Sequence, residues 1–369
     1  MIKIIYAIAT LSGTIIGVGL FALPYVTLKV GFWVILGYFL ILGSLVVLIH
    51  LFFGELSLKT PDFKRLPGFA RIYLGNGGEL IAYISTIFGI FGALLAYLIV
   101  GGEFLTELLK PILGGNYLIY TLFYFIVGAF LIFFGIKAIA KVEFWGLILF
   151  FAILAAIFFR GQNFIDIQNL FIGNWEPGSG NLFLPYGVIL FSLWGATLIP
   201  EIEEMLRGRK KTILKIIPIA ILIPMIVYLF FIYLILGITG PQTTESALTG
   251  LRNILGDGTV SLALILGLLT TFTSFITVGL TLKKVFWYDF KLNKNLAWLI
   301  TCFVPLILYL AGFQGFIAVI SAVGGIMLAV DGILILLMYK KVRPERKFLV
   351  YPLILLLLGG IIYSIVYFS

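Results

Sequence analysis

The chain has 369 residues, of which 62% are hydrophobic and only 11% are charged, and its formal net charge is +9. A soluble domain carries roughly 25% charged residues, so this composition excludes a soluble globular protein and indicates one that is surrounded by lipid. The chain has one cysteine and one histidine, which excludes an internal disulfide and any metal centre built from several such residues.

Eleven apolar segments follow one another along the chain, and only the ninth is clearly shorter than a usual membrane span. A spanning helix needs about 20 apolar residues, and the alternating ten-residue pattern of a membrane β-barrel is missing. The segments cover 3–28, 31–57, 79–109, 117–136, 141–159, 182–206, 212–238, 258–288, 296–311, 314–339 and 349–368. The sequence therefore predicts an all-α integral membrane protein with about 11 transmembrane helices.

The basic residues are distributed unevenly between the two ends of these segments. With the N-terminus placed in the cytoplasm, 21 of the 25 Lys and Arg residues fall on the cytoplasmic side, and only Lys29, Lys110, Arg160 and Arg252 fall outside. This split obeys the positive-inside rule. The first apolar stretch lacks a clear cleavage site, so we interpret it as a retained span. We expect a multi-pass protein of the cell membrane with its N-terminus inside and its C-terminus outside, and no nucleic-acid partner.

The first segment contains the stretch SGTIIGVGLFALPY, from Ser12 to Tyr25. Its three glycines and its proline weaken a helix. Unpaired backbone groups persist inside a membrane only where they line a cavity or are buried in protein. Gly13 and Gly17 also have the small-xxx-small spacing of packed membrane helices, so helix packing is the alternative explanation of this stretch.

The sixth segment repeats part of that pattern. Residues Gly19 to Pro24 and Gly195 to Pro200 both read G-x-x-x-(Leu/Ile)-Pro. Matched breaks in two halves of a chain indicate the binding site of a transporter built from inverted repeats. Free N–H groups at the start of a half-helix attract a carboxylate, and free carbonyls at the end of one attract an ammonium group or a metal cation. Two such breaks suit a zwitterionic substrate.

This pattern divides the chain into two related halves. We expect a single transporter domain over 1–369, with the first repeat at about 1–159, the second at about 182–339 and an extra helix at about 349–368.

Three stretches resemble the amino acid permeases of the amino acid–polyamine–organocation superfamily: GTIIGVGLFALPY, LFSLWGATLIPEIEE and TTFTSFITVGL. The nearest resemblance is to the amino acid/auxin permease branch, which includes bacterial hydroxy/aromatic amino acid permeases and sodium-coupled neutral amino acid transporters. It implies a leucine-transporter-type fold, in which a 5+5 inverted repeat has discontinuous helices 1 and 6. It also implies alternating access, in which helices 1, 2, 6 and 7 rock against helices 3, 4, 8 and 9.

The resemblance implies a substrate site at the two breaks. The residues of the first break would bind the substrate carboxylate through backbone N–H groups or a hydroxyl, and those just before Gly195 would offer carbonyls to the amine. An aromatic residue of the third segment would cover the substrate, with plain packing as its alternative role. The implied residues are Thr14, Gly17, Val18, Gly19, Tyr97, Phe191, Ser192, Trp194 and Gly195.

The resemblance also implies a sodium site, because Thr270 to Ser274 follow the family spacing in the eighth segment. Sodium is a hard cation that prefers oxygen ligands. The implied ligands are the hydroxyls of Thr273 and Ser274 and the carbonyls of Thr270, Gly13 and Ile16. The alternative is that these hydroxyls bond back to carbonyls of their own helix.

A proton is the alternative coupling ion. An ionisable residue inside a span is a functional-site hypothesis, and the two candidates are Asp331, nine residues before Lys340, and Glu201. An interhelical hydrogen bond is the other explanation of Asp331. Further ionisable residues inside the segments are His50, Glu55 and Glu103.

Other functional classes find little support in the sequence. Metalloprotease, P-loop and nucleophile-elbow motifs are missing, so we expect no enzyme and no cofactor beyond the coupling ion. An ion channel, which usually needs a symmetric oligomer or a polar pore, and a nutrient sensor are the alternatives of another class. We predict a monomer in the lipid bilayer that couples amino acid uptake to an ion gradient, with sodium favoured and a proton-coupled permease or exchanger as the alternative.

Overall fold

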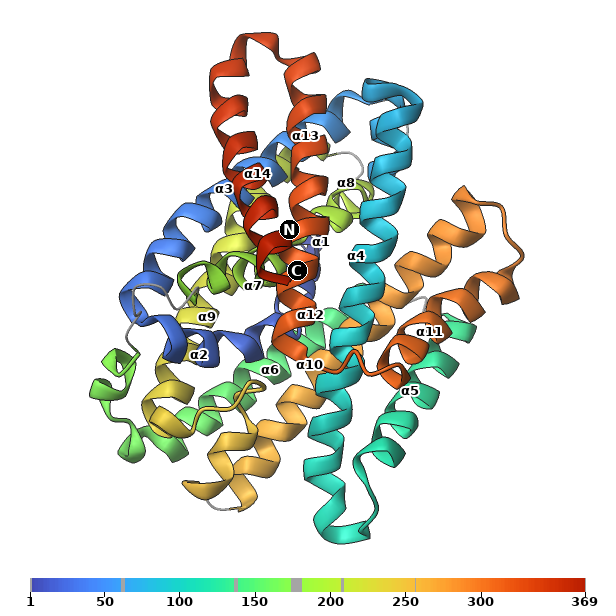
Figure 1. Ribbon diagram of the computed structural model, residues 1–369. Coiled ribbons are helices and arrows are strands. Elements are labelled where there is room, and N and C mark those ends of the chain that lie inside the picture. The colour runs from blue at the N-terminus through green and yellow to red at the C-terminus, as the bar shows by residue number, and fades with distance from the viewer. Residues whose placement is uncertain are drawn as a thin grey trace.

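The computed structural model describes residues 2–60, 64–135, 139–173, 181–206, 209–255 and 257–368. All regular structure in these ranges is helical, which agrees with the predicted all-α class (Figure 1). Residues 174–180 and the basic residues Lys137 and Arg207 lie outside the described residues.

The main helices follow one another along the chain with short connections. They are α1 Ile2–Ile15, α2 Gly19–Val30, α3 Phe32–Lys59, α4 Leu66–Leu113, α5 Tyr117–Phe134, α6 Ile139–Gly161, α7 Leu184–Leu193, α8 Ile199–Met205, α9 Ile213–Thr239, α10 Asp257–Lys284, α11 Lys294–Leu310, α12 Phe316–Ala322, α13 Ala329–Val342 and α14 Lys347–Phe368. Short 3-10 turns, among them Ala196–Leu198, and two π-helical segments, Val285–Asp289 and Val323–Leu328, connect or interrupt them.

These helices reproduce the predicted membrane segments. Within the described residues nine helical stretches are long and apolar enough to span a membrane, the bent pair α1 and α2 makes a tenth, and α11 is an apolar helix of only 17 residues. The predicted sixth segment consists of α7 and α8 in succession, and the tenth of α12, a π-helical segment and α13. The helix α4 begins at Leu66, earlier than the predicted residue 79, and a glycine with a φ of 80° at Gly75 separates this added part from the span.

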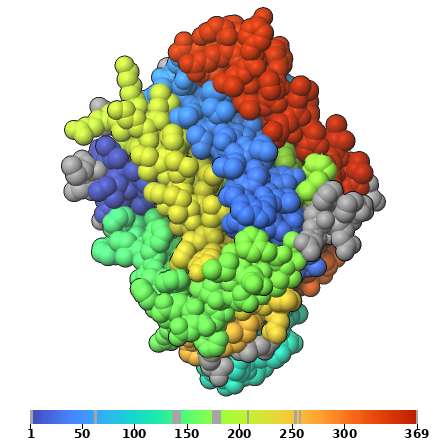
Figure 2. Space-filling view, turned by 90° about the vertical axis from the view of Figure 1, so that its left-hand side faces the viewer, coloured from blue at the N-terminus to red at the C-terminus, as the bar shows by residue number. Residues whose placement is uncertain are grey.

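The helices gather into two groups. One group contains α2, α3, α7 and α9, which pack on one another, with α1 packed on α9. The other contains α4, α5, α10 and α11, with α10 lying along α4. Figure 2 shows α3 and α9 side by side on one face of the molecule. Since α13 packs on both α3 and α4, while α6 packs on both α1 and α10, these two helices connect the groups.

The outer surface is apolar. Large side chains such as Trp33, Ile226 and Phe348 are more than half exposed, and a soluble protein rarely exposes so many of them. Lipid is the solvent that suits such a surface.

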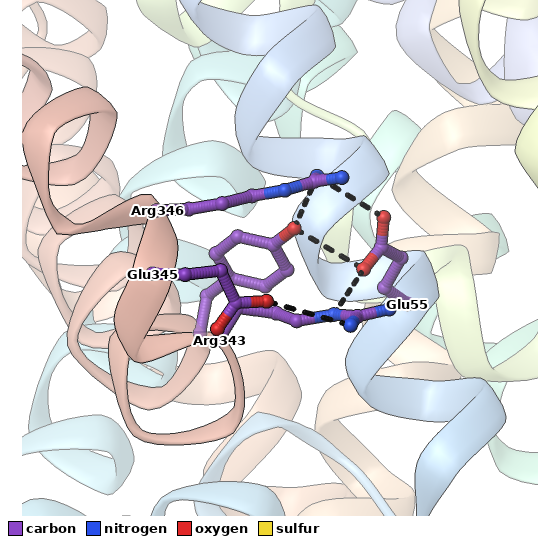
Figure 3. A network of polar contacts seen from close by, with 5 residues as sticks. Glu55, Arg343, Glu345 and Arg346 are labelled. Atoms are coloured by element: carbon purple, nitrogen blue, oxygen red, sulfur yellow. Dashed lines mark hydrogen bonds and ion pairs between the residues drawn. The ribbon is translucent and has the colours of Figure 1, made fainter.

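A network of polar contacts joins the end of α3 to α13 and to the 3-10 turn Pro344–Arg346 that precedes α14 (Figure 3). The Glu55 carboxylate accepts a hydrogen bond of 3.1 Å from the Tyr339 hydroxyl and lies 3.6 Å from both the Arg343 and Arg346 side chains. The ring of Tyr339 stacks on Phe52 of α3, with 3.9 Å between ring centroids. Glu55 therefore has charged partners of its own, and its role is to hold α13 against α3.

Candidate functional site

The first span is broken between α1 and α2. The helix α1 ends at Ile15, α2 begins at Gly19, and their axes meet at an angle of 51°. The Gly17 N–H donates to the Ile15 carbonyl over 2.7 Å, a tight turn that ends the regular pattern of α1. The sequence predicted a break in this stretch, and the structure places it at residues 16–18.

The backbone N–H groups of Val18 and Gly19 at the start of α2 are available to a ligand. The next two N–H groups, those of Leu20 and Phe21, bond to the Gly17 and Val18 carbonyls over 3.3 and 3.1 Å. The first N–H groups of a helix have no partner in the preceding turn, and no backbone bond from the Val18 or Gly19 N–H is found among the described residues, so these two donors can bind a ligand. The helix dipole adds partial positive charge there. A carboxylate fits this point.

The second break separates α7 from α8. The helix α7 ends at Leu193, Trp194 is extended with a ψ of 122°, and the next turn is a short 3-10 segment. At Gly195 a Cβ atom would lie only 2.8 Å from Leu11 Cδ1 and 2.9 Å from Ile15 Cγ1. A side chain at Gly195 would therefore displace Leu11 and Ile15, because the second break packs directly on α1.

The two breaks together line one cavity. The volume of this cavity is about 80 Å³, below the usual range of about 300–1,000 Å³ for ligand sites, so the cavity has to widen to hold an amino acid. Its lining includes eight of the nine residues predicted for the substrate: Thr14, Gly17, Val18, Gly19, Tyr97, Phe191, Ser192 and Trp194. The ninth, Gly195, lies in the contact between the breaks instead of in the cavity wall.

Tyr97 lies against the first break. Its side chain is 5% exposed, and a Cβ atom at Gly17 would lie 2.6 Å from its hydroxyl oxygen. The side chain therefore borders the cavity beside the predicted carboxylate site. The Thr14 hydroxyl and the Trp194 indole nitrogen are buried, and neither has a hydrogen-bond partner among the described residues.

Sequence reasoning missed Tyr228, which joins the two breaks. This residue of α9 is fully buried, and its hydroxyl oxygen lies 2.6 Å from the Ile15 carbonyl oxygen and 2.7 Å from the Ser192 carbonyl oxygen. The carbonyls belong to the last turns of the two half-helices. Because one phenol proton is shared between two carbonyls, each of them keeps capacity to accept a further hydrogen bond. Tyr228 is one of 18 tyrosines, and no motif distinguishes it.

His50 supports the second break from α3. Its Nε2 accepts the Gly195 N–H over 2.9 Å, and its Nδ1 lies 2.7 Å from the Val46 carbonyl oxygen. These bonds assign the proton to Nδ1, because Nε2 must accept and a carbonyl cannot donate. The single histidine was noted as an ionisable residue in a span, but its partner in the sixth segment could not be predicted from spacing.

The residues predicted for sodium gather beside the first break. Gly13, Ile16, Thr270 and Thr273 line a separate, small cavity that is completed by residues of α6. The Thr273 hydroxyl also donates to the Leu269 carbonyl over 2.9 Å, which is the alternative that the sequence left open. The predicted fifth ligand, Ser274, does not line this cavity, and its buried hydroxyl has no hydrogen-bond partner among the described residues.

A site for a multivalent metal finds no support. Among the residues that the structure describes, no group of three or more His, Cys, Asp or Glu side chains is placed to hold a metal ion. The oxygens around the small cavity are neutral, a donor set that suits a weakly held monovalent cation better than a divalent one.

The two candidate proton sites lie in different places. Asp331 is 1% exposed, accepts a hydrogen bond from the Ser85 hydroxyl, and lines the same cavity as the two breaks. Glu201 lines a second, more polar cavity together with Arg65 and Asp289, which are 3.3 Å apart. Of the two residues, only Asp331 can therefore contact a ligand held at the breaks.

Comparison with known protein families gives one match over nearly the whole chain. A model described as the tryptophan/tyrosine permease family matches residues 1–367. The chain is 25% identical over 394 residues to the tyrosine-specific transport system 1 of Haemophilus influenzae, which covers 99% of this chain and 96% of that protein. It is 24% identical over 345 residues to the low affinity tryptophan permease of Escherichia coli K12, which covers 86% of this chain and 82% of that one.

Two solved structures share the fold. Mhp1, a nucleobase-cation-symport-1 family transporter in a closed conformation with bromovinylhydantoin bound, aligns with a TM-score of 0.70 and 14% identity over 93% of this chain and 79% of its own. MhsT in complex with L-phenylalanine aligns with a TM-score of 0.62 and 15% identity over 96% of this chain and 98% of its own. The predicted leucine-transporter-type fold is thereby confirmed.

Proposed function

The chain belongs to the tryptophan/tyrosine permease family, and from this premise we propose that it carries aromatic amino acids across the cell membrane by ion-coupled alternating access. Family membership and fold make it a secondary transporter and not an enzyme. The relatives named above act on tyrosine and tryptophan, which suggests the aromatic side chain.

The observation that carries this proposal is the shared cavity at the two helix breaks. The Val18 and Gly19 N–H groups and the Thr14 hydroxyl would bind the substrate carboxylate. Phe191, Ser192 and Trp194 also line the cavity, and their carbonyls would accept from the amine. Such a site holds the zwitterion that all amino acids share, and leaves the side chain to the rest of the cavity.

The walls of the cavity suit an aromatic ring. Ile90, Val278, Val323 and Leu328 supply apolar surface, and burial of such surface stabilises a bound ring. Tyr97 would cover the substrate from the side of α4.

We propose sodium as the coupling ion. Four of its five predicted ligand residues line one small cavity between α1 and α10. An ion held there would bond to helices of both groups, and its binding would therefore depend on their relative position. A proton is the second candidate, because Asp331 lies in the substrate cavity itself.

The remaining features follow the sequence predictions. We propose that the N-terminus is cytoplasmic and the C-terminus outside, and that the two repeats cover 1–159 and 182–339. We also propose that the protein acts as a monomer and that it belongs to the amino acid/auxin permease branch. The group of α1, α2, α3 and α7 to α9 would rock against the group of α4, α5, α10 and α11.

Uptake into proteoliposomes tests the proposal. We expect labelled tyrosine or tryptophan to accumulate when an inward sodium gradient is imposed, and not when potassium replaces sodium. If the substrate accumulates only when a pH gradient is imposed, the coupling ion is the proton and not sodium. Lack of uptake of any aromatic amino acid under either gradient, with empty liposomes as the blank, would refute the proposed substrate class.

A further inference from the structure

The substrate cavity contains one charged side chain that the binding of a zwitterion does not use. Among the described residues that line the cavity, only Asp331 is charged. It lies at the start of α13, directly after the π-helical segment Val323–Leu328, whose two end residues also line the cavity. Short π-helical turns inside helices are frequent at functional sites.

Asp331 and the first break lie at different points along the cavity. Thr86, Gly89, Ile90, Ala93 and Tyr97 line it along a single face of α4. Thr86 and Tyr97 are eleven residues apart, which corresponds to about 16 Å along a helix. Tyr97 contacts the first break, whereas Ser85, next to Thr86, bonds to Asp331. The carboxylate is therefore displaced from the carboxylate-binding end of the cavity.

The side chain of Trp194 extends from the second break towards the part of α13 that carries this carboxylate. Its backbone forms the break, while the far end of its indole reaches α13: a Cβ atom on Gly332 would lie 3.4 Å from Trp194 Cη2. Gly332 directly follows Asp331. The second break and the part of α13 next to Asp331 are thus separated by about the length of one aromatic side chain, that of Trp194.

A second polar atom lies at the same end. The Thr86 hydroxyl is buried and has no hydrogen-bond partner among the described residues, and Thr86 lines the cavity. An unpaired buried hydroxyl is costly unless a ligand or water completes its bonds. A carboxylate has about four acceptor sites, and the Ser85 hydroxyl uses one of those on Asp331.

We propose that Asp331 and Thr86 form a subsite that accepts the hydrogen-bond donor on the substrate ring, the phenol O–H of tyrosine or the indole N–H of tryptophan. Ser85 acts as a positioning residue that holds the carboxylate. This inference rests on the proposed transport of aromatic amino acids. It adds to that proposal the reason why a ring with a donor is selected over phenylalanine.

Selection of tyrosine or tryptophan over phenylalanine follows because phenylalanine would leave the polar groups of the subsite without a hydrogen-bond donor. A ring without a donor would place the Asp331 carboxylate and the Thr86 hydroxyl against carbon, and buried polar groups without partners reject such analogues strongly. A hydrogen bond to a charged acceptor corresponds to about 10- to 100-fold in affinity.

Matched ligands and variants test the subsite in the purified full-length protein in sodium buffer. The ligands are tyrosine against phenylalanine, and tryptophan against 1-methyltryptophan, which lacks only the N–H. The variants are Asp331→Leu and Thr86→Val. The control is Thr301→Val, since Thr301 is fully buried in α11 and bonds to the carbonyl of Ala297 in its own helix.

We expect the wild type to bind tyrosine about 10- to 100-fold more tightly than phenylalanine, with a similar ratio for tryptophan over 1-methyltryptophan. In Asp331→Leu both ratios fall to about 1, in Thr86→Val they fall part of the way, and in Thr301→Val they stay at the wild-type value. Thr86→Val keeps the shape of the side chain, so it carries the test if Asp331→Leu does not fold.

Four results would overturn parts of this account. Equal affinity of the wild type for tyrosine and phenylalanine, or an unchanged ratio in Asp331→Leu, would overturn the subsite and leave the proposed function intact. An equal loss of affinity for all four ligands in Asp331→Leu would assign Asp331 to the cavity structure or to ion coupling, and would also overturn the subsite. A wild type that binds no aromatic amino acid would overturn the proposed function itself.

Discussion

Replacing Gly19 by alanine tests how closely the two breaks must approach. Gly19 is the first residue of α2, and a Cβ atom there would lie 2.9 Å from Ser192 Cα. Carbon atoms in contact are about 3.5–4.0 Å apart, so the backbones of α2 and α7 would have to separate by roughly 0.6–1.1 Å. A side-chain rotation cannot relieve the contact, because Ser192 Cα belongs to the backbone.

The size of the effect follows from this overlap. Overpacking of a buried contact costs about 1–3 kcal/mol. Alanine in place of glycine gains at most about 1 kcal/mol in helix propensity, so the overlap dominates. The net cost, up to about 2 kcal/mol in the arrangement with the two breaks in contact, lowers affinity by up to roughly 30-fold.

The assay is equilibrium binding of tyrosine or tryptophan to purified Gly19→Ala, with Gly37→Ala as the matched control. Gly37 lies in α3, and a Cβ atom there meets nothing within 4 Å, so this variant should bind like the wild type. Affinity of Gly19→Ala within twofold of the wild type would show that the breaks tolerate separation, and the reasoning about their contact would be wrong.

Three further substitutions test other bonds of the site. Tyr228→Phe leaves two buried carbonyls without their donor at about 1–3 kcal/mol each, so the melting temperature should fall more than in Tyr186→Phe, which removes a single 3.3 Å bond; equal shifts would contradict the bridge. His50→Leu leaves the Gly195 N–H unpaired and should weaken substrate binding by about tenfold. His50→Gln keeps a hydrogen-bond acceptor and should retain most of the affinity. Equal substrate affinities of the two variants would show that His50 does not support the site. The double change Thr273→Ala and Ser274→Ala should abolish the increase in substrate affinity that sodium produces, while Thr271→Ala, whose hydroxyl bonds to its own helix, should leave it; sodium dependence that survives the double change would exclude this ion site.

The membrane spans and the breaks could be predicted because local composition determines them. Apolar length, glycine and proline positions and the basic residues at span ends are properties of short stretches, and the helices follow the predicted segments closely. The added part of α4 was missed because residues 66–74 form a helix that ends in a glycine turn before the apolar run begins.

The contacts between distant segments could not be predicted in the same way. Residues Tyr228 and Ser192 are 36 positions apart, and His50 and Gly195 are 145 apart, and no spacing rule relates such pairs. Ser274 was predicted as an ion ligand but does not line the small cavity, for the same reason. Its position in the sequence suits an ion ligand, but three helices together form the cavity wall. Asp331 was noted as an ionisable residue, yet its place in the substrate cavity depends on the packing of α13 against α4.

The bridge made by Tyr228 has a mechanical meaning. Its single hydroxyl joins α1 and α7 to α9, so a movement of one half-helix without the other would break one of the two contacts. The small cavity between α1 and α10 is lined by the same end of α1 that this bridge holds. If α1, α7 and α9 move together, an ion of the kind proposed above would tie their position to that of α10.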